Sequence, residues 1–112
     1  MSPAEVVQRQ VDAYNARDLD RFVATYDDAI EVFRMPATTP AITGKAALAA
    51  FYATQRFIRP GLHAEIVNRI AFGNKVIDHE RIAGLGAKIL EVAVVYEVRD
   101  ARIRTTWLFG AA

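Results

Sequence analysis

The sequence predicts an α+β domain in which three N-terminal helices pack on a curved, mainly antiparallel sheet that encloses a pocket. Helical periodicity is confined to the first half of the chain, and runs of alternating β-branched and aromatic residues fill the second half. Glycines at positions 73, 84 and 86 fall where consecutive strands must turn. With 112 residues, 53% of them hydrophobic, the chain is expected to form a single domain over residues 1–112.

Capping residues and glycine–proline breaks delimit the three predicted helices. The first should begin at residue 3, because Ser2 can cap it and Glu5 completes a capping box. Asp18 can cap a second helix, which we expect to close at Asp27-Asp28. A third begins after Gly44 and ends before Pro60-Gly61.

Alternating patterns predict one early strand and four later antiparallel strands. Residues 30–34 form the early strand, and the two prolines within residues 35–43 predict a loop there. Residues 62–72 and 75–83 are the next two strands, joined by a turn at Gly73-Asn74. Residues 88–109 then form a closing hairpin with a polar turn in its middle.

The closing hairpin has one face that is apolar enough to wall a core or a cavity. Strand alternation predicts that this face carries Val92, Val94, Tyr96, Val98, Ile103, Thr105, Trp107 and Phe109. The opposite face would then carry Val76, Ile82, Ala93, Val95 and Leu108. Because all three helices are needed on the concave side, this outer face would be uncovered. It therefore predicts a homodimer formed through the outer sheet face.

The composition indicates a small-molecule partner. A net charge of +1, with acids and bases interspersed, gives no reason to expect binding to nucleic acid or to a membrane surface. There is no cysteine, and the two histidines lack an obvious third ligand, so we expect no metal site and no cofactor. Neither a signal peptide nor a long apolar run is present, so a cytoplasmic location is expected.

Short stretches along nearly the whole chain resemble one superfamily. They are Val6-Val7-Gln8-Arg9, Asn15-Ala16-Arg17-Asp18-Leu19-Asp20, Asp27-Asp28-Ala29, Gly44-Lys45-Ala46-Ala47, Phe51-Tyr52-Ala53 and Leu108-Phe109-Gly110. Together with the element order, they resemble the nuclear transport factor 2-like superfamily, and within it the ketosteroid isomerases and SnoaL-like cyclases. The resemblance implies a cone-shaped domain around a hydrophobic pocket, isomerase or cyclase chemistry, and dimers.

The catalytic residues of the two best-matching enzyme types are not reproduced. The isomerase tyrosine falls on Gln10, its general-base aspartate on or near Met35, and its oxyanion aspartic acid on Val94. Limonene epoxide hydrolase is similar around Glu80-Arg81-Ile82-Ala83, where its arginine matches Arg81 but its aspartate falls on an alanine. Its second aspartate falls on Trp107 or Leu108, depending on the gap. The machinery of neither enzyme is therefore expected.

His79 and Arg81 are the main candidates for acid–base chemistry, with Tyr14 as a further catalytic candidate. The match to the hydrolase arginine implies that both side chains face the cavity, where histidine could act as a base beside a fixed cation. The alternative is an outward polar face, since Asp78 and Glu80 occupy the alternate positions and a one-residue slip would exchange the two sets.

The remaining candidates would bind the substrate. They are Gln10, Arg34, Tyr52, Val94, Tyr96, Thr105, Trp107 and Phe109. We therefore expect a small-molecule enzyme of the isomerase, cyclase or hydrolase type that acts by acid–base chemistry on a hydrophobic, enolisable or anionic substrate. The alternatives are a non-catalytic binding protein and a dimeric association module of the same fold.

Overall fold

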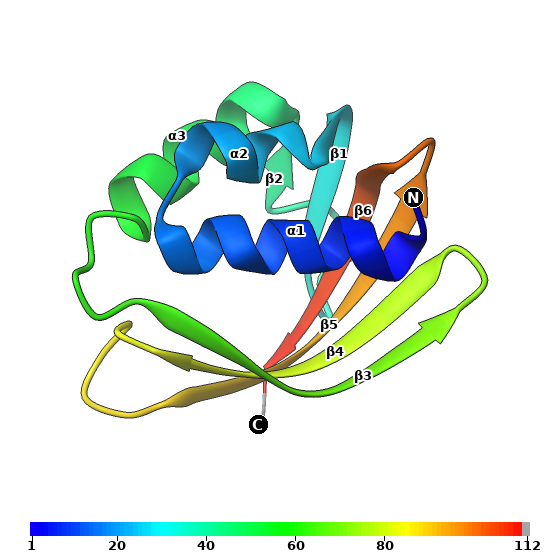
Figure 1. Cartoon of the computed structure of the whole chain (residues 1–112). Helices are drawn as coiled ribbons and strands as arrows, with labels where there is room; N and C mark the ends of the chain where they lie inside the picture. Colours follow the sequence, from blue (N-terminus) through cyan, green and yellow to red (C-terminus); the bar gives the residue numbers. More distant parts are fainter. Residues whose placement is uncertain (111–112) are drawn as a thin grey trace.

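Three helices pack on the concave face of a six-stranded sheet in the computed structural model, which describes residues 1–110 (Figure 1). The helices are α1 (Pro3–Ala16), α2 (Leu19–Ala24) and α3 (Lys45–Gln55). The strands are β1 (Tyr26–Arg34), β2 (Ile42–Thr43), β3 (His63–Phe72), β4 (Lys75–Ala83), β5 (Leu90–Arg99) and β6 (Arg102–Gly110). They lie in the order β2-β1-β6-β5-β4-β3, and only the β1–β6 pair is parallel. The predicted α+β class is confirmed.

Helix α1 begins with the predicted capping box and crosses the concave face of the sheet (Figure 1). The hydroxyl of Ser2 accepts the Glu5 N–H, and the Glu5 carboxylate accepts the Ser2 N–H. At the other end, the Asn15 amide donates to the Ala64 carbonyl over 3.0 Å and accepts the Ala64 N–H over 2.8 Å. These two bonds attach the end of the helix to β3.

The segment between α2 and α3 contains more strand than the sequence predicted. Helix α2 ends at Ala24, and β1 begins at Tyr26, so Asp27-Asp28 lies within the strand and does not close the helix. Ile42 and Thr43 pair with β1 as a short antiparallel strand, although residues 35–43 were predicted as a loop. The prolines restrict only the residues that precede this strand, and Ile42 is buried.

A β-bulge in β6 determines which of its side chains face the helices. Val98 pairs with Ile103 and Glu97 with Thr105, so Arg104 is an extra residue. Ile103 faces inward as predicted, but beyond the bulge Thr106 and Leu108 face inward. The inward placement predicted for three residues of this strand is therefore wrong, and they face outward: Thr105, Trp107 and Phe109.

Strand β4 also faces opposite to the prediction. Its inward side chains are Val76, Asp78, Glu80 and Ile82. Those predicted to line the cavity, His79 and Arg81, lie on the outer face. Two of the four inward residues are carboxylic acids, which strand alternation alone would place in solvent. Each has a hydrogen-bond partner on the concave side, which allows it to be buried.

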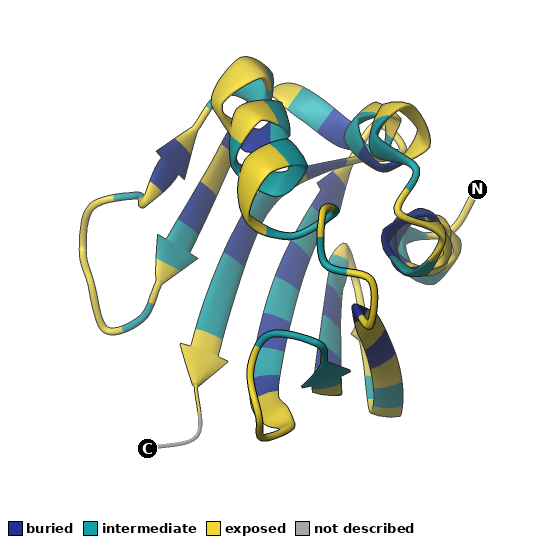
Figure 2. Ribbon diagram, turned by 90° about the vertical axis from the view of Figure 1, so that its left-hand side faces the viewer, coloured by how far each residue is buried: buried dark blue, intermediate teal, exposed yellow. Residues whose placement is uncertain are grey.

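Burial alternates along β4 and β5, so in these strands the concave face is separated from the outer face (Figure 2). Between the helices and the sheet, Phe22 is fully buried, with its ring centre 4.5 Å from that of Tyr52 and 5.1 Å from that of Tyr26. Such aromatic clusters bury a large apolar area and fix the helices that carry them. Within residues 1–110, no helix combines the length and the apolar character that crossing a membrane requires.

Candidate active site

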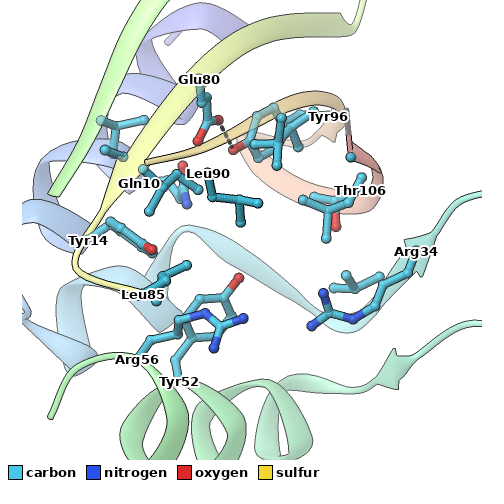
Figure 3. A pocket seen from close by; sticks show the side chains of 18 of the residues that line it. Gln10, Tyr14, Arg34, Tyr52, Arg56, Glu80, Leu85, Leu90, Tyr96 and Thr106 are labelled. Atoms are coloured by element: carbon cyan, nitrogen blue, oxygen red, sulfur yellow. Dashed lines mark hydrogen bonds between the residues drawn. The ribbon is translucent and has the colours of Figure 1, made fainter. Parts of the chain in front are cut away.

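A cavity of about 240 Å³ lies between the helices and the concave face of the sheet (Figure 3). Helix α1 contributes Gln10 and Tyr14, and α3 contributes Tyr52. The sheet wall is mainly apolar and is closed at one side by Leu85 in the loop between β4 and β5. Ligand pockets usually measure about 300–1,000 Å³, so this cavity suits a compact ligand.

Glu80 is the acidic group of the cavity wall. Its side chain projects from β4, the residue is only 5% exposed, and its Oε2 accepts a 3.0 Å hydrogen bond from the Tyr96 hydroxyl. Burial raises the pKa of Glu80 to about 7, with a further increase from the nearby Asp78 charge, while the Tyr96 hydrogen bond and Arg69 act in the opposite direction. At neutral pH this carboxyl can therefore both accept and donate a proton.

Asp78 lies two residues away on the same face but has a different environment. It is fully buried, and its two oxygens accept hydrogen bonds from Nε and Nη2 of Arg69 at 2.7 and 2.9 Å. The same guanidinium donates to Gln8 of α1, which completes a link between β4, β3 and the helix. All the strong partners of Asp78 are internal, so it serves as a structural anchor.

Phenol groups supply neutral hydrogen-bond donors to the cavity. Burial raises the pKa of Tyr14, Tyr26, Tyr52 and Tyr96 above the ordinary value, so each hydroxyl remains protonated at neutral pH. Among the described residues, Gln10 Oε1 is a buried side-chain acceptor without a hydrogen-bond partner. Such a group can receive a donor from a ligand.

Six of the residues predicted from the sequence to form the site line this cavity: Gln10, Tyr14, Arg34, Tyr52, Val94 and Tyr96. His79 and Arg81 do not, and the imidazole of His79 contacts the Glu91 carboxylate on the outer face. Thr105, Trp107 and Phe109 are also outside, and Trp107 stacks on Phe33 there.

Sequence reasoning missed Glu80, Arg56 and Thr106, which all line the cavity. The sequence offered one signal for Glu80: it is next to His79 in the strand, so the two side chains must point to opposite faces of the sheet. Within residues 1–110, no three His, Asp or Glu side chains gather closely enough to hold a metal ion. The polar side chains of the cavity are one carboxyl group, several phenols, an amide, the Thr106 hydroxyl and two arginines.

A curved sheet that holds a pocket beneath three helices defines the nuclear transport factor 2-like class, and solved structures of this class match the chain closely. A candidate ketosteroid isomerase of Kribbella flavida matches with a TM-score of 0.83 and 22% identity, over 98% of this chain and 78% of that one. A SnoaL-like protein of unknown function from Burkholderia thailandensis matches with a TM-score of 0.81 and 23% identity, over 98% of this chain and 94% of that one. A candidate polyketide cyclase of Sinorhizobium meliloti matches with a TM-score of 0.80 and 17% identity, over 93% of both chains.

The family model of the SnoaL-like domain matches residues 7–106. The chain therefore belongs to the SnoaL-like domain family of the nuclear transport factor 2-like superfamily, as the sequence resemblance predicted. No curated protein matches it.

Proposed function

We propose that the protein is a small-molecule enzyme of the isomerase or cyclase type, in which Glu80 transfers a proton on an apolar, enolisable substrate. The observation that carries this proposal is a carboxyl group in the cavity wall that is only 5% exposed and that, among the described residues, accepts a hydrogen bond only from a phenol. Burial raises the pKa of this group to about 7. General acid–base catalysis is most efficient when the pKa of the group lies near the working pH. The names of two structural neighbours, a candidate ketosteroid isomerase and a candidate polyketide cyclase, support this class by analogy.

The proposed step begins with the Glu80 carboxylate, which removes a proton from the carbon next to a carbonyl group. The electrons of the broken C–H bond form the enolate, and its oxygen accepts hydrogen bonds from cavity phenols such as Tyr14 and Tyr52. The Glu80 carboxylic acid then returns the proton to the substrate at the same or another carbon. Tyr96 holds the carboxyl group in place throughout.

Proton–deuterium exchange tests this function without knowledge of the product. Apolar ketones would be incubated with the protein in D₂O, and deuterium at the carbon next to the carbonyl would be followed by NMR. The exchange rate should rise with pH through a value near 7, and Glu80→Gln should lower it by about 10²-fold or more. Glu65→Gln, which changes an exposed carboxylate of β3, is the matched control.

Exchange that Glu80→Gln leaves unchanged contradicts the proposal. If the Gln variant still binds ketones and neither protein catalyses exchange, the same apolar cavity supports the second candidate function, a non-catalytic binding protein.

The outer sheet face supports a homodimer, although its residues differ from those predicted. Of the predicted patch, only Ala93 and Val95 lie outside, whereas Val76, Ile82 and Leu108 face the core or the cavity. An apolar row instead runs across five paired strands: Ile70, Ile77, Val95, Trp107 and Phe33. No helix covers this face (Figure 1).

A second copy of the chain is the occupant that fits this face. The row carries five apolar side chains, an area on the order of a few hundred Å², which is large for a monomer surface. Both charge signs flank it, with Lys75 beside Glu97, so a two-fold axis could bring opposite charges together.

Sedimentation at micromolar concentration tests the dimer. The native chain should sediment at twice its 12.4 kDa mass, Val95→Arg should sediment as a monomer, and Glu97→Arg at the rim should change little. If the native chain sediments as a monomer, the dimer hypothesis is wrong, but the proposed role of the cavity is unaffected.

A further inference from the structure

We infer that the substrate is an organic anion: a compact, apolar oxo acid whose carboxylate binds Arg34 and Arg56 at the cavity mouth. This inference names the substrate class of the same cavity and rests on the proposed role of Glu80. It adds an anion-binding pair of arginines, of which Arg56 was not anticipated from the sequence.

The two arginines come from different elements and meet at one aromatic ring. Arg34 is on β1 and Arg56 directly follows α3, and both line the cavity. Their guanidinium carbons lie 5.4 and 4.9 Å from the centre of the Phe51 ring. Figure 3 shows the two guanidinium groups directed toward one another, on the side of the cavity away from Glu80 and Tyr96.

Neither guanidinium group has a carboxylate partner in the described part of the chain. Within residues 1–110, Arg34 and Arg56 form no ion pair with a carboxylate, in contrast to Arg69, which is fully engaged by Asp78. Burial raises the pKa of Tyr52, and the charges of Arg56 and Arg34 oppose that rise, so both cations act on the same hydroxyl. Two like charges held at one cavity mouth favour an anion between them.

The distribution of groups in the cavity determines the chemistry and orientation of that anion. A guanidinium fork matches a carboxylate with two parallel hydrogen bonds, so the carboxylate is the expected anionic group. Leu85, Leu90 and Val94 provide an apolar wall for the body of the ligand. Glu80 is at the opposite side, where its own charge would repel a carboxylate. The ligand therefore binds with its acid at the mouth and its enolisable carbonyl near Glu80.

Calorimetry with a matched pair of probes tests this orientation. Benzoylpropionate is an apolar oxo acid with one carboxylate, and benzoylpropionamide is its neutral analogue of nearly the same shape. At neutral pH the native protein should bind the acid at least roughly tenfold more tightly than the amide. Raising the salt concentration from about 0.05 to about 0.5 M should weaken binding of the acid and leave binding of the amide unchanged.

Variants then assign the preference to the two arginines. Arg34→Gln and Arg56→Gln should each weaken binding of the acid by roughly tenfold and leave the amide unchanged. Arg59→Gln removes the same charge from the same segment but from a residue that does not line the cavity, so it should have little effect. Unchanged binding of the amide also shows that each variant is folded.

Three results would overturn the inference: equal binding of acid and amide, no binding of the acid at millimolar concentration, or acid binding that neither arginine variant weakens. The Glu80→Gln protein separates this inference from the proposed function. It should retain the preference for the acid, because it keeps both arginines. If the exchange reaction proves independent of Glu80 while the arginine variants weaken the acid, the proposed function fails and the anion site stands.

Discussion

Replacing Glu80 by glutamine should make the protein more stable at alkaline pH. Glutamine has nearly the same shape, and its carbonyl oxygen can still accept the Tyr96 hydroxyl, but it cannot ionise. A buried carboxylate without a cationic partner costs free energy in the folded state, and the neutral amide avoids this cost. The ionised Glu80 side chain should therefore reduce the stability of the fold at alkaline pH.

The magnitude follows from the pKa of the Glu80 carboxyl, which rises from 4.5 to about 7 on folding. Because the folded state holds the proton more tightly, the stability linked to Glu80 is highest below pH 4.5. It falls as the pH rises from 4.5 toward 7 and is constant at higher pH. The total loss is about 3 kcal/mol, since each pKa unit corresponds to about 1.4 kcal/mol.

Urea unfolding of the native protein and of Glu80→Gln, across the range from about pH 4 to about pH 8, measures this loss. The two free energies of unfolding should nearly agree at the acid end, and the variant should be more stable by up to about 3 kcal/mol at the alkaline end. Glu65→Gln is the control for removal of an exposed carboxylate, and its difference from the native protein should stay small. Parallel pH profiles for the native protein and Glu80→Gln would show that Glu80 titrates normally and would remove the basis of the acid–base proposal.

Two further substitutions test the frame around the cavity. Asp78→Asn removes the counter-ion of Arg69 and should cost about 3–5 kcal/mol in urea unfolding; a loss below about 1 kcal/mol would contradict the anchor role. Gly84→Ala should cost about 1–3 kcal/mol, because φ is +91° and the added Cβ would lie 2.5 Å from the Gly61 carbonyl carbon. Gly86→Ala, where the Cβ would meet nothing within 4 Å, should be close to neutral in the same urea unfolding experiment.

Elements governed by local chemistry could be predicted from the sequence. The capping box at Ser2 and Glu5 and the Asp18 cap of α2 involve residues only three positions apart, and the structure shows both. The inward face of β5 was also predictable. Its inward positions carry aliphatic residues such as Val94 and one aromatic residue, Tyr96, and no charge, whereas its outward positions include Glu91 and Glu97.

The facing of β4 and β6 depends on information that is not local. In β4 one alternating set contains two apolar and two charged residues, and the other contains two apolar and three polar or charged residues, so periodicity does little to distinguish them. In β6 the alternation is interrupted at Arg104, and a bulge in this strand becomes visible only when its pairing with β5 is known. One extra residue exchanges the faces of all the residues that follow it in the strand. Trp107 and Phe109 therefore lie on the outer face and not in the cavity, where they were predicted.

Asp78 and Glu80 are carboxyl groups on the same face of β4, but they have different surroundings and different roles. Both face inward, and both are at most 5% exposed. Asp78 has a guanidinium partner that occupies both of its oxygens, so its charge is used to hold β3 against β4. Within residues 1–110, Glu80 has only the phenol of Tyr96 as a hydrogen-bond partner, which binds one oxygen and supplies no charge. When two neighbouring carboxyl groups have different environments, their pKa values can differ, which leaves one of them able to transfer protons. The position of Arg69 on β3 therefore determines which acid of β4 is neutralised, and the acid it leaves unpaired lines the cavity.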